Sequence, residues 1–236
     1  MEDSTPSIPS GRIVRAVFGV ANDKMHNPGL TLLSLYSDIN NHLLQDSRPS
    51  AYLSGISSCP LFQQYPFHML YRLKGTEQSP KYHPEGNVWN HTLLVVDEAA
   101  KVKPDSRDPA AFMWAALLHD IGKPATTTVR KGKITAYDHD KVGSELSKEF
   151  LREFTDDSDF IHKVSGLIRY HMQILFVLKN LPFADIRGMK SDTDINEVAL
   201  LGLCDRLGRT NCNRAKEQEN IRLFLQKCTS TKHLFG

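Results

Sequence analysis

Apolar residues recur at helical spacing along most of the chain, and no region shows several alternating strands in succession. Near the start, Leu32, Tyr36, Ile39 and Leu43 fall on one face of a predicted helix. The next segment, 47–66, contains Pro, Ser and Gly, and we expect a loop with short turns there. These patterns predict a mostly α-helical protein.

The second part of the chain is predicted to form a series of helices. One predicted helix covers residues 88–102 and carries His91. Asp108 before Pro109 marks the start of the next, because aspartate accepts hydrogen bonds from free N–H groups and proline tolerates the first turn. That helix is apolar on nearly every face until Gly-Lys-Pro at 122–124 stops it. Four later apolar stripes predict further helices: Val142, Leu146, Phe150 and Phe154; Phe160, Val164, Leu167, Ile168 and His171; Val198 and Leu201, on a helix from about Asp194 to Asp205; and Ile221, Phe224, Leu225 and Cys228.

One strand pair is expected in this helical chain. β-branched residues stand on both sides of Lys131-Gly132, which predicts a short β-hairpin. We therefore expect an all-α fold with one hairpin, in which residues 81–236 form a helical bundle domain. Residues 1–80 are predicted to form a helical extension, and its acidic start, which contains Pro and Ser, is expected to be disordered. The sequence leaves the role of this extension open.

The composition is ordinary for a globular protein, with 40% hydrophobic and 24% charged residues among 236. That length is enough to bury a substantial core without disulfides. No apolar run is long enough to cross a membrane, and the start lacks the basic and apolar regions of a signal peptide. The four cysteines form no Cys-x-x-Cys pair, so we expect reduced thiols and a cytoplasmic protein.

Six polar residues stand on apolar helix faces or at helix ends, where burial without a partner is costly. They are His91, His119, Asp120, His139, His171 and Asp205. Imidazole nitrogens and carboxylate oxygens bind borderline divalent metals, and helix bundles assemble such sites from inward-facing side chains on different helices. Each residue alone also has a simpler explanation. His171 suits a hydrogen-bonded core histidine, and Asp205 suits an ion pair with Arg206 or Arg209.

Taken as an ordered set, these residues resemble the H…HD…D signature of the HD superfamily of metal-dependent phosphohydrolases. The stretches HPEGNVWNHTLLVVDEA, AALLHDIGKP, GKITAYDHDKVGSE, LIRYHM and CDRLGR look like the HD domain appended to many bacterial tRNA nucleotidyltransferases. The resemblance covers residues 84–209. It implies that His91, His119, Asp120 and Asp205 are metal ligands.

The same resemblance gives His139 and His171 a role in a second metal site, in which Asp120 bridges two ions. In the alternative, the site holds one ion, and these two histidines hydrogen-bond to substrate or water. Mixed histidine and carboxylate sites accept Fe, Mn, Co, Ni or Zn according to supply. We therefore expect one or two divalent transition-metal ions as cofactor.

Metal chemistry predicts a hydrolytic mechanism. A bound divalent ion lowers the pKa of its water to near neutrality and withdraws charge from a phosphoryl oxygen, so that hydroxide attacks phosphorus in line. Lys123, Arg169, Arg206 and Arg209 are candidates to neutralise the remaining phosphate oxygens, and Lys123 is the strongest of them. Asp120 and Lys123 are the predicted catalytic residues. For the cations, and above all for Arg209, charge at a helix C-terminus is the simpler explanation.

The expected substrate is a small nucleotide-type phosphoester: a phosphomonoester, a 2′,3′-cyclic phosphodiester or a dinucleoside polyphosphate. We expect no nucleotide addition, because no Gly-Ser loop with a strand-borne Asp-x-Asp precedes the HD pattern, and Asp192-x-Asp194 suits a helix N-cap. The Gly-Tyr-Pro motif of HD-GYP cyclic dinucleotide phosphodiesterases is missing, as is the Glu-Asp of alarmone hydrolases.

The competing hypothesis is a non-catalytic module that binds a nucleotide or an RNA end. The formal net charge of +2 gives no general attraction for nucleic acid, although local clusters of Lys and Arg can still hold a phosphate. The expected partners are therefore a small phosphoester or an RNA end, and not a membrane. The oligomeric state is left open.

Overall fold

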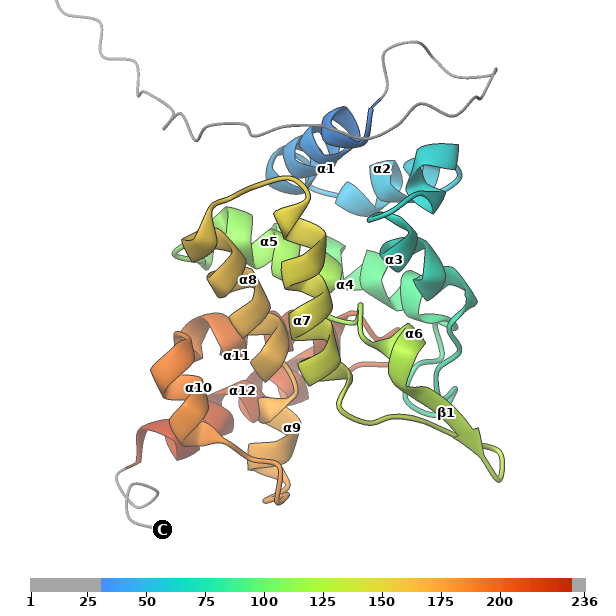
Figure 1. Cartoon of the computed structure of the whole chain (residues 1–236). Helices are drawn as coiled ribbons and strands as arrows, with labels where there is room; N and C mark the ends of the chain where they lie inside the picture. Colours follow the sequence, from blue (N-terminus) through green and yellow to red (C-terminus); the bar gives the residue numbers. More distant parts are fainter. Residues whose placement is uncertain (1–30, 231–236) are drawn as a thin grey trace, which may run out of the picture.

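The computed structural model describes residues 31–230 of the chain (Figure 1). The disorder predicted for the start of the chain falls on residues 1–30, outside this part. In chain order the elements are α1 (Leu32–Gln45), α2 (Pro49–Ile56), η1 (Pro60–Gln63), α3 (His68–Tyr71), η2 (Arg72–Gly75), α4 (Val88–Val102), η3 (Lys103–Asp105), α5 (Pro109–Leu118), α6 (Lys123–Thr126), β1 (Thr127–Arg130), β2 (Lys133–Ala136), α7 (His139–Arg152), α8 (Ser158–Tyr170), α9 (Gln173–Leu178), α10 (Ile186–Asp192), α11 (Ile195–Leu207) and α12 (Arg214–Thr229). The predicted all-α fold with one short hairpin is confirmed. Within the described part, no helix combines the length and the apolar character that crossing a membrane requires.

Local sequence signals set several of these boundaries. Helix α4 spans the predicted residues 88–102. Asp108 caps α5, since its Oδ1 accepts the N–H of Ala111 at 3.1 Å. Strands β1 and β2 pair antiparallel, and Lys131 and Gly132 form the turn with positive φ angles of 50° and 71°. Two consecutive positive φ angles are typical of the tight turns that join hairpin strands.

The loop predicted for residues 47–66 is wrong in part. Helix α2 and the short helix η1 lie in this segment, and both begin with a proline. Proline is favoured at the first position of a helix, where its missing N–H is not needed. Leu53 from α2 and Phe62 from η1 are fully buried in the core. The prolines therefore start helices here, and do not simply interrupt them.

The apolar stripe predicted for α7 faces the core only in part. Phe150 is buried, but Val142 and Leu146 are half-buried, and Gly143 is buried between them. Helix α7 packs along α8, and a Cβ at Gly143 would lie 3.2 Å from the side chain of Ile168. A small residue is required at such a close crossing of two helices. The close packing brings the start of α7 near the end of α8.

Helix α5 lies at the centre of the bundle. Its residues from Ala111 to Leu118 are all buried, because α1, α4, α8 and α11 pack around it. A helix surrounded in this way has no polar face, which explains its apolar sequence. Helices α1 and α2 cover one end of the bundle, and α12 packs against α11 and α9 toward the other (Figure 1).

The N-terminal extension shares the hydrophobic core of the following helices. The indole nitrogen of Trp114 donates a hydrogen bond to Asn40 Oδ1 at 2.9 Å. Lys103 Nζ donates to the carbonyl oxygens of Leu43 and Asp46 at 3.1 Å and 3.0 Å. One core therefore runs across the predicted domain boundary, and the division at that point stays a prediction.

The backbone of α6 lies against the first turn of α7 at Gly122. A Cβ at this position would overlap the carbonyl oxygen of His139 and would lie 2.6 Å from the backbone nitrogen of Gly143. Neither backbone atom can move away without displacing the start of α7. Gly122 therefore permits the close approach that brings Asp120 next to His139.

We predict that Gly122→Ala lowers the free energy of unfolding by about 1–3 kcal/mol, because the added methyl group overpacks two backbone segments. Urea denaturation followed by circular dichroism measures this change. Gly55→Ala is the matched control, since Gly55 lies exposed in α2 with open space around it. That variant is expected to be unchanged or more stable by up to about 1 kcal/mol. Equal effects of the two substitutions would contradict the role of Gly122.

Candidate metal centre

The bundle brings all six predicted metal-binding residues to one buried place. His91 lies in α4, His119 and Asp120 follow the last turn of α5, His139 opens α7, His171 follows α8, and Asp205 lies near the end of α11. Their exposed fractions range from 0% for His91 and His119 to 8% for Asp205. Side chains that are far apart in the sequence therefore share one site in the interior.

Asp120 stands in the middle of this group. Its Oδ2 lies 3.2 Å from Nε2 of His119, and its Oδ1 lies 3.5 Å from Nε2 of His139 and 4.0 Å from Nε2 of His171. The carboxylate belongs to two clusters, in each of which the candidate ligand atoms lie within 4.8 Å of one another. One cluster adds His91 and His119, and the other adds His139 and His171. Both oxygens of one carboxylate therefore lie near candidate ligand atoms of separate histidines.

Asp205 joins the centre through His91, whose Nε2 lies 2.9 Å from Oδ1 of Asp205. Burial alone would raise the pKa of Asp205, but the guanidinium of Arg209 and the hydrogen bond from His91 hold it well below its usual range. Burial would lower the pKa of His91, but the carboxylates of Asp205 and Glu85 raise it. Asp205 is therefore ionised at neutral pH and offers an oxygen donor.

Three of the histidines share one backbone hydrogen bond, from ring Nδ1 to the carbonyl oxygen three residues earlier. The pairs are His119 with Ala116 at 2.9 Å, His139 with Ala136 at 2.7 Å, and His171 with Ile168 at 2.7 Å. A carbonyl oxygen only accepts, so Nδ1 carries the proton, and Nε2 of the neutral ring keeps its lone pair. For His119 and His171, the carbonyl belongs to the last turn of a helix, where it has no partner within the helix.

The ring nitrogens fit a bound cation. Nε2 of His119 is buried without a hydrogen-bond partner, and the Nε2 atoms of His139 and His171 lie 3.2 Å apart. Neither of those two atoms has a proton to donate in the tautomer that the carbonyls select. A buried polar atom without a partner costs about 1–3 kcal/mol. A divalent ion would pair with these nitrogens and with Asp120, so the donor set fits a borderline metal.

The protonation states are also those that metal coordination requires. Burial lowers the pKa of His139, and it lowers the pKa of His171 to about 4. Burial alone would raise the pKa of Asp120, but His119 and Lys123 outweigh it and hold that pKa well below its usual range. At neutral pH the centre therefore presents the neutral imidazoles of His139 and His171 next to the ionised carboxylate of Asp120.

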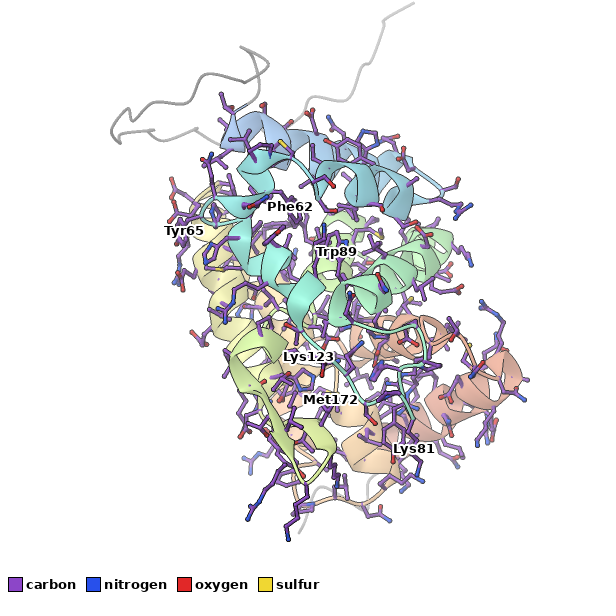
Figure 2. All side chains as sticks on the ribbon, turned by 90° about the vertical axis from the view of Figure 1, so that its right-hand side faces the viewer. Phe62, Tyr65, Lys81, Trp89, Lys123 and Met172 are labelled. Atoms are coloured by element: carbon purple, nitrogen blue, oxygen red, sulfur yellow. The ribbon has the colours of Figure 1, made fainter. Side chains whose placement is uncertain are left out.

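Lys123 reaches the centre from the start of α6. Its Nζ lies 2.6 Å from Oδ2 of Asp120 and donates a hydrogen bond to Oε1 of Gln78 at 2.6 Å. In Figure 2, Lys123 lies between the hairpin and the segment that carries Lys81. The strongest candidate for binding a phosphate therefore contacts the carboxylate that both clusters share.

Two other predicted phosphate-binding cations are paired with acids outside the centre. Nη1 of Arg169 donates to Asp140 at 2.8 Å, and Nη1 of Arg206 donates to Glu217 at 2.9 Å. Asp140 belongs to the first turn of α7, next to the centre, whereas Glu217 belongs to α12. Of the predicted arginines, only Arg209 forms an ion pair with one of the six residues.

The sequence analysis missed Glu85. Its Oε1 lies 2.9 Å from Nδ1 of His91 and 2.9 Å from Nδ1 of His83, and its side chain is 2% exposed. Glu85 lies in the irregular segment 76–87, between η2 and α4, where no periodicity indicates which side chains face inward. Its place in the stretch HPEG, just ahead of the helix that carries His91, was the available signal.

Two surface hollows lie close to the centre but do not include it. Their volumes are about 330 Å³ and 570 Å³, and both are lined by Arg72 and Pro124. Ile121, which follows Asp120 in the chain, lines the smaller hollow. None of the six residues lines either hollow.

Comparison with known proteins gives relatives for part of the chain. A Multifunctional CCA protein from Actinobacillus pleuropneumoniae serotype 5b is 37% identical over 93 residues, which are 38% of this chain and 22% of the relative. Another, from Methylococcus capsulatus, is 30% identical over 132 residues, 54% of this chain and 28% of the relative. The CC-adding tRNA nucleotidyltransferase of Thermus thermophilus is 33% identical over 89 residues, 37% of this chain and 20% of the relative. The chain therefore spans less than a third of the length of these curated relatives.

A sequence model of the HD domain matches residues 88–210, which is more than half of the chain. The matched region begins with α4 and extends just past α11, so it contains all six residues of the centre. This agrees with the resemblance in the sequence, which rests on the same histidines and aspartates. The chain belongs to the HD domain family.

Proposed function

We propose that the protein is a metal-dependent phosphohydrolase that acts on a nucleotide-type phosphoester. The observation that carries the proposal is the carboxylate of Asp120, which belongs to both clusters of buried histidines. His119 lies next to its Oδ2, and His139 lies next to its Oδ1. A structural core histidine needs a hydrogen-bond partner, whereas these Nε2 atoms face one another and a carboxylate. That arrangement supports coordination of one or two divalent ions.

In this proposal His91, His119, Asp120 and Asp205 hold the first ion, and His139 and His171 join Asp120 in holding a second. Such an ion, when bound, supplies an activated water and polarises a phosphoryl oxygen. The Nδ1–carbonyl hydrogen bonds fix the orientation of three of the rings before any ligand arrives. The donor set suits Fe, Mn, Co, Ni or Zn.

Lys123 is the proposed phosphate-binding residue. Its ammonium group, held between Asp120 and Gln78, lies where an anion next to the centre would meet it. Arg209 is the second choice, because its Nη2 lies 3.4 Å from Oδ2 of Asp205. Arg169 and Arg206 rank lower, since each would have to exchange its present carboxylate partner for a phosphate.

The names of the relatives support a nucleotide or an RNA end as the substrate class. Those names describe tRNA nucleotidyltransferases and CCA proteins, and the stretches that these relatives share with this chain cover 38%, 54% and 37% of it. Within that class we propose a phosphomonoester, a 2′,3′-cyclic phosphodiester or a dinucleoside polyphosphate. Four free cysteines suit the reducing cytoplasm that we propose as the location.

The alternative is a module that binds a nucleotide or an RNA end without hydrolysing it. The complete set of six buried donor groups favours the enzyme, because a binding module has no need to keep a water-activating centre. The two hypotheses differ in one property, since only the enzyme loses a measurable rate when Asp120 is changed.

We predict that Asp120→Asn lowers the rate of phosphoester hydrolysis at least about a hundredfold, because it removes the shared charge at nearly constant size. Release of phosphate or nucleoside is measured with 2′,3′-cyclic AMP, diadenosine tetraphosphate and p-nitrophenyl phosphate. Asp159→Asn, which changes an exposed acid of α8, is the control and should keep the wild-type rate. A wild-type protein that binds these nucleotides and hydrolyses none of them would support the alternative.

We also predict about two equivalents of transition metal per chain in protein purified without chelators or a histidine tag. Plasma mass spectrometry measures the content directly. His139→Gln combined with His171→Gln is expected to reduce it to about one equivalent, because the second cluster then lacks both imidazoles. His162→Gln, an exposed histidine of α8, is the control. One equivalent in the wild-type protein would contradict the dinuclear site and favour the mononuclear alternative.

A further inference from the structure

Glu85 is a buried acid that the proposed mechanism does not use. Its Oε1 stands between two imidazoles, 2.9 Å from Nδ1 of His91 and 2.9 Å from Nδ1 of His83. Its side chain is only 2% exposed, so the charge is almost fully removed from water. A buried carboxylate is costly unless its partners compensate it, so this position calls for an explanation.

The explanation lies in the place of His91 in the fold. The other three histidines of the centre stand at or just beyond a helix end, where a backbone carbonyl accepts the proton of Nδ1. His91 lies within α4, and the carbonyls of the surrounding turns accept the hydrogen bonds of the helix itself. A carbonyl is therefore not available to its Nδ1, and a side chain must provide the acceptor.

Nε2 of His91 donates a hydrogen bond to Oδ1 of Asp205 at 2.9 Å in this structure. We propose that Glu85 is the positioning residue that keeps a proton on Nδ1 of His91 when Nε2 loses its own proton on metal binding. This inference rests on the proposed function, because it takes His91 as a metal ligand. In this role Glu85 accepts the Nδ1 proton of His91, as backbone carbonyl oxygens accept the Nδ1 protons of the other three rings. As a carboxylate it adds a negative charge, which makes the imidazole a stronger donor to a metal ion.

Glu85 is itself fixed by the turn that leads into α4. Gly86 has a φ of 106°, a conformation that L side chains rarely adopt, and it reverses the chain directly after Glu85. The amide of Asn90 donates to the carbonyl oxygen of Glu85 at 3.1 Å, and the amide of Gln78 donates to that of Gly86 at 3.4 Å. The carboxylate is thus held against His91 by its own backbone.

The contacts of the two rings agree with this role. Oε1 of Glu85 is hydrogen-bonded to Nδ1 of His83 at 2.9 Å, and Nδ1 of His91 lies at the same distance from it. Nε2 of His91 is directed to Asp205, so Glu85 is the acceptor that the structure places beside Nδ1.

The test measures the affinity of the full chain for Zn²⁺ by competition with a chromogenic chelator. Glu85→Ala is expected to weaken binding by about 10- to 100-fold, the usual effect of removing an outer hydrogen-bond partner of a metal ligand. Glu85→Gln should weaken it less, because the amide oxygen can still accept. Glu77→Gln is the matched control, since it makes the same change at an exposed position of the same segment. Thermal unfolding of each variant identifies any loss of fold.

A second readout reports the tautomer itself. Long-range ¹H–¹⁵N spectra of the Zn²⁺-loaded protein, labelled on histidine, show which ring nitrogen of His91 carries the proton. We expect Nδ1–H in the wild-type protein and loss of that preference in Glu85→Ala. Wild-type affinity in Glu85→Ala, or an unchanged His91 tautomer, would overturn the inference.

The Zn²⁺-binding test and the hydrolysis assay can fail independently of each other. If the wild-type protein binds Zn²⁺ and the Glu85 variants behave as expected, but no phosphoester is hydrolysed, the inference stands and the proposed function fails. If hydrolysis is found and Glu85→Ala binds metal normally, the proposed function stands and the inference fails. A wild-type protein that binds no metal overturns both.

Discussion

The arrangement of the whole bundle depends on one buried, ionised and shared carboxylate, that of Asp120. Removing an isolated carboxylate from water costs several kcal/mol, so the surroundings must supply compensating charge and ring nitrogens. Lys123 supplies the charge at 2.6 Å, and histidines carried by separate helices supply the nitrogens. Each helix that contributes one of these groups must therefore start, end or run next to Asp120. The packing of α5 and α7 against α8 brings these groups to that point.

At the helix ends, backbone carbonyl oxygens alone are enough to orient most of these histidine rings. A histidine placed just after a helix finds a free carbonyl oxygen three residues earlier, and that bond both fixes the ring and selects its tautomer. His139 obtains the same bond from the end of strand β2. The hairpin is thus part of the centre, because its last residue orients a ring, and Gly122 lets α6 approach closely enough for that ring to meet Asp120.

Much of this could be predicted from the sequence, and the exceptions have physical causes. Helical periodicity and the Asp-Pro signal located α4 and the start of α5 well, because amphipathic faces and caps are local properties. The prediction that Gly-Lys-Pro at 122–124 stops this helix is wrong, because α5 ends at Leu118 and these residues begin the short helix α6. Periodicity failed for residues 47–66, where prolines start helices, and for the small residues that α7 buries against α8. The six candidate ligands could be named, but their partners could not. Glu85 lies in irregular chain, and the choice of Asp140 or Glu217 as a partner for an arginine depends on tertiary packing.

Some residues that contact the centre lie just outside the range that the HD domain model matches. The HD domain match begins at residue 88, yet Gln78 accepts a hydrogen bond from Lys123 and Glu85 contacts His91. Both belong to the segment that connects the N-terminal extension to α4, and the extension is bound into the same core. A substitution in that segment therefore acts directly on the charges around the centre.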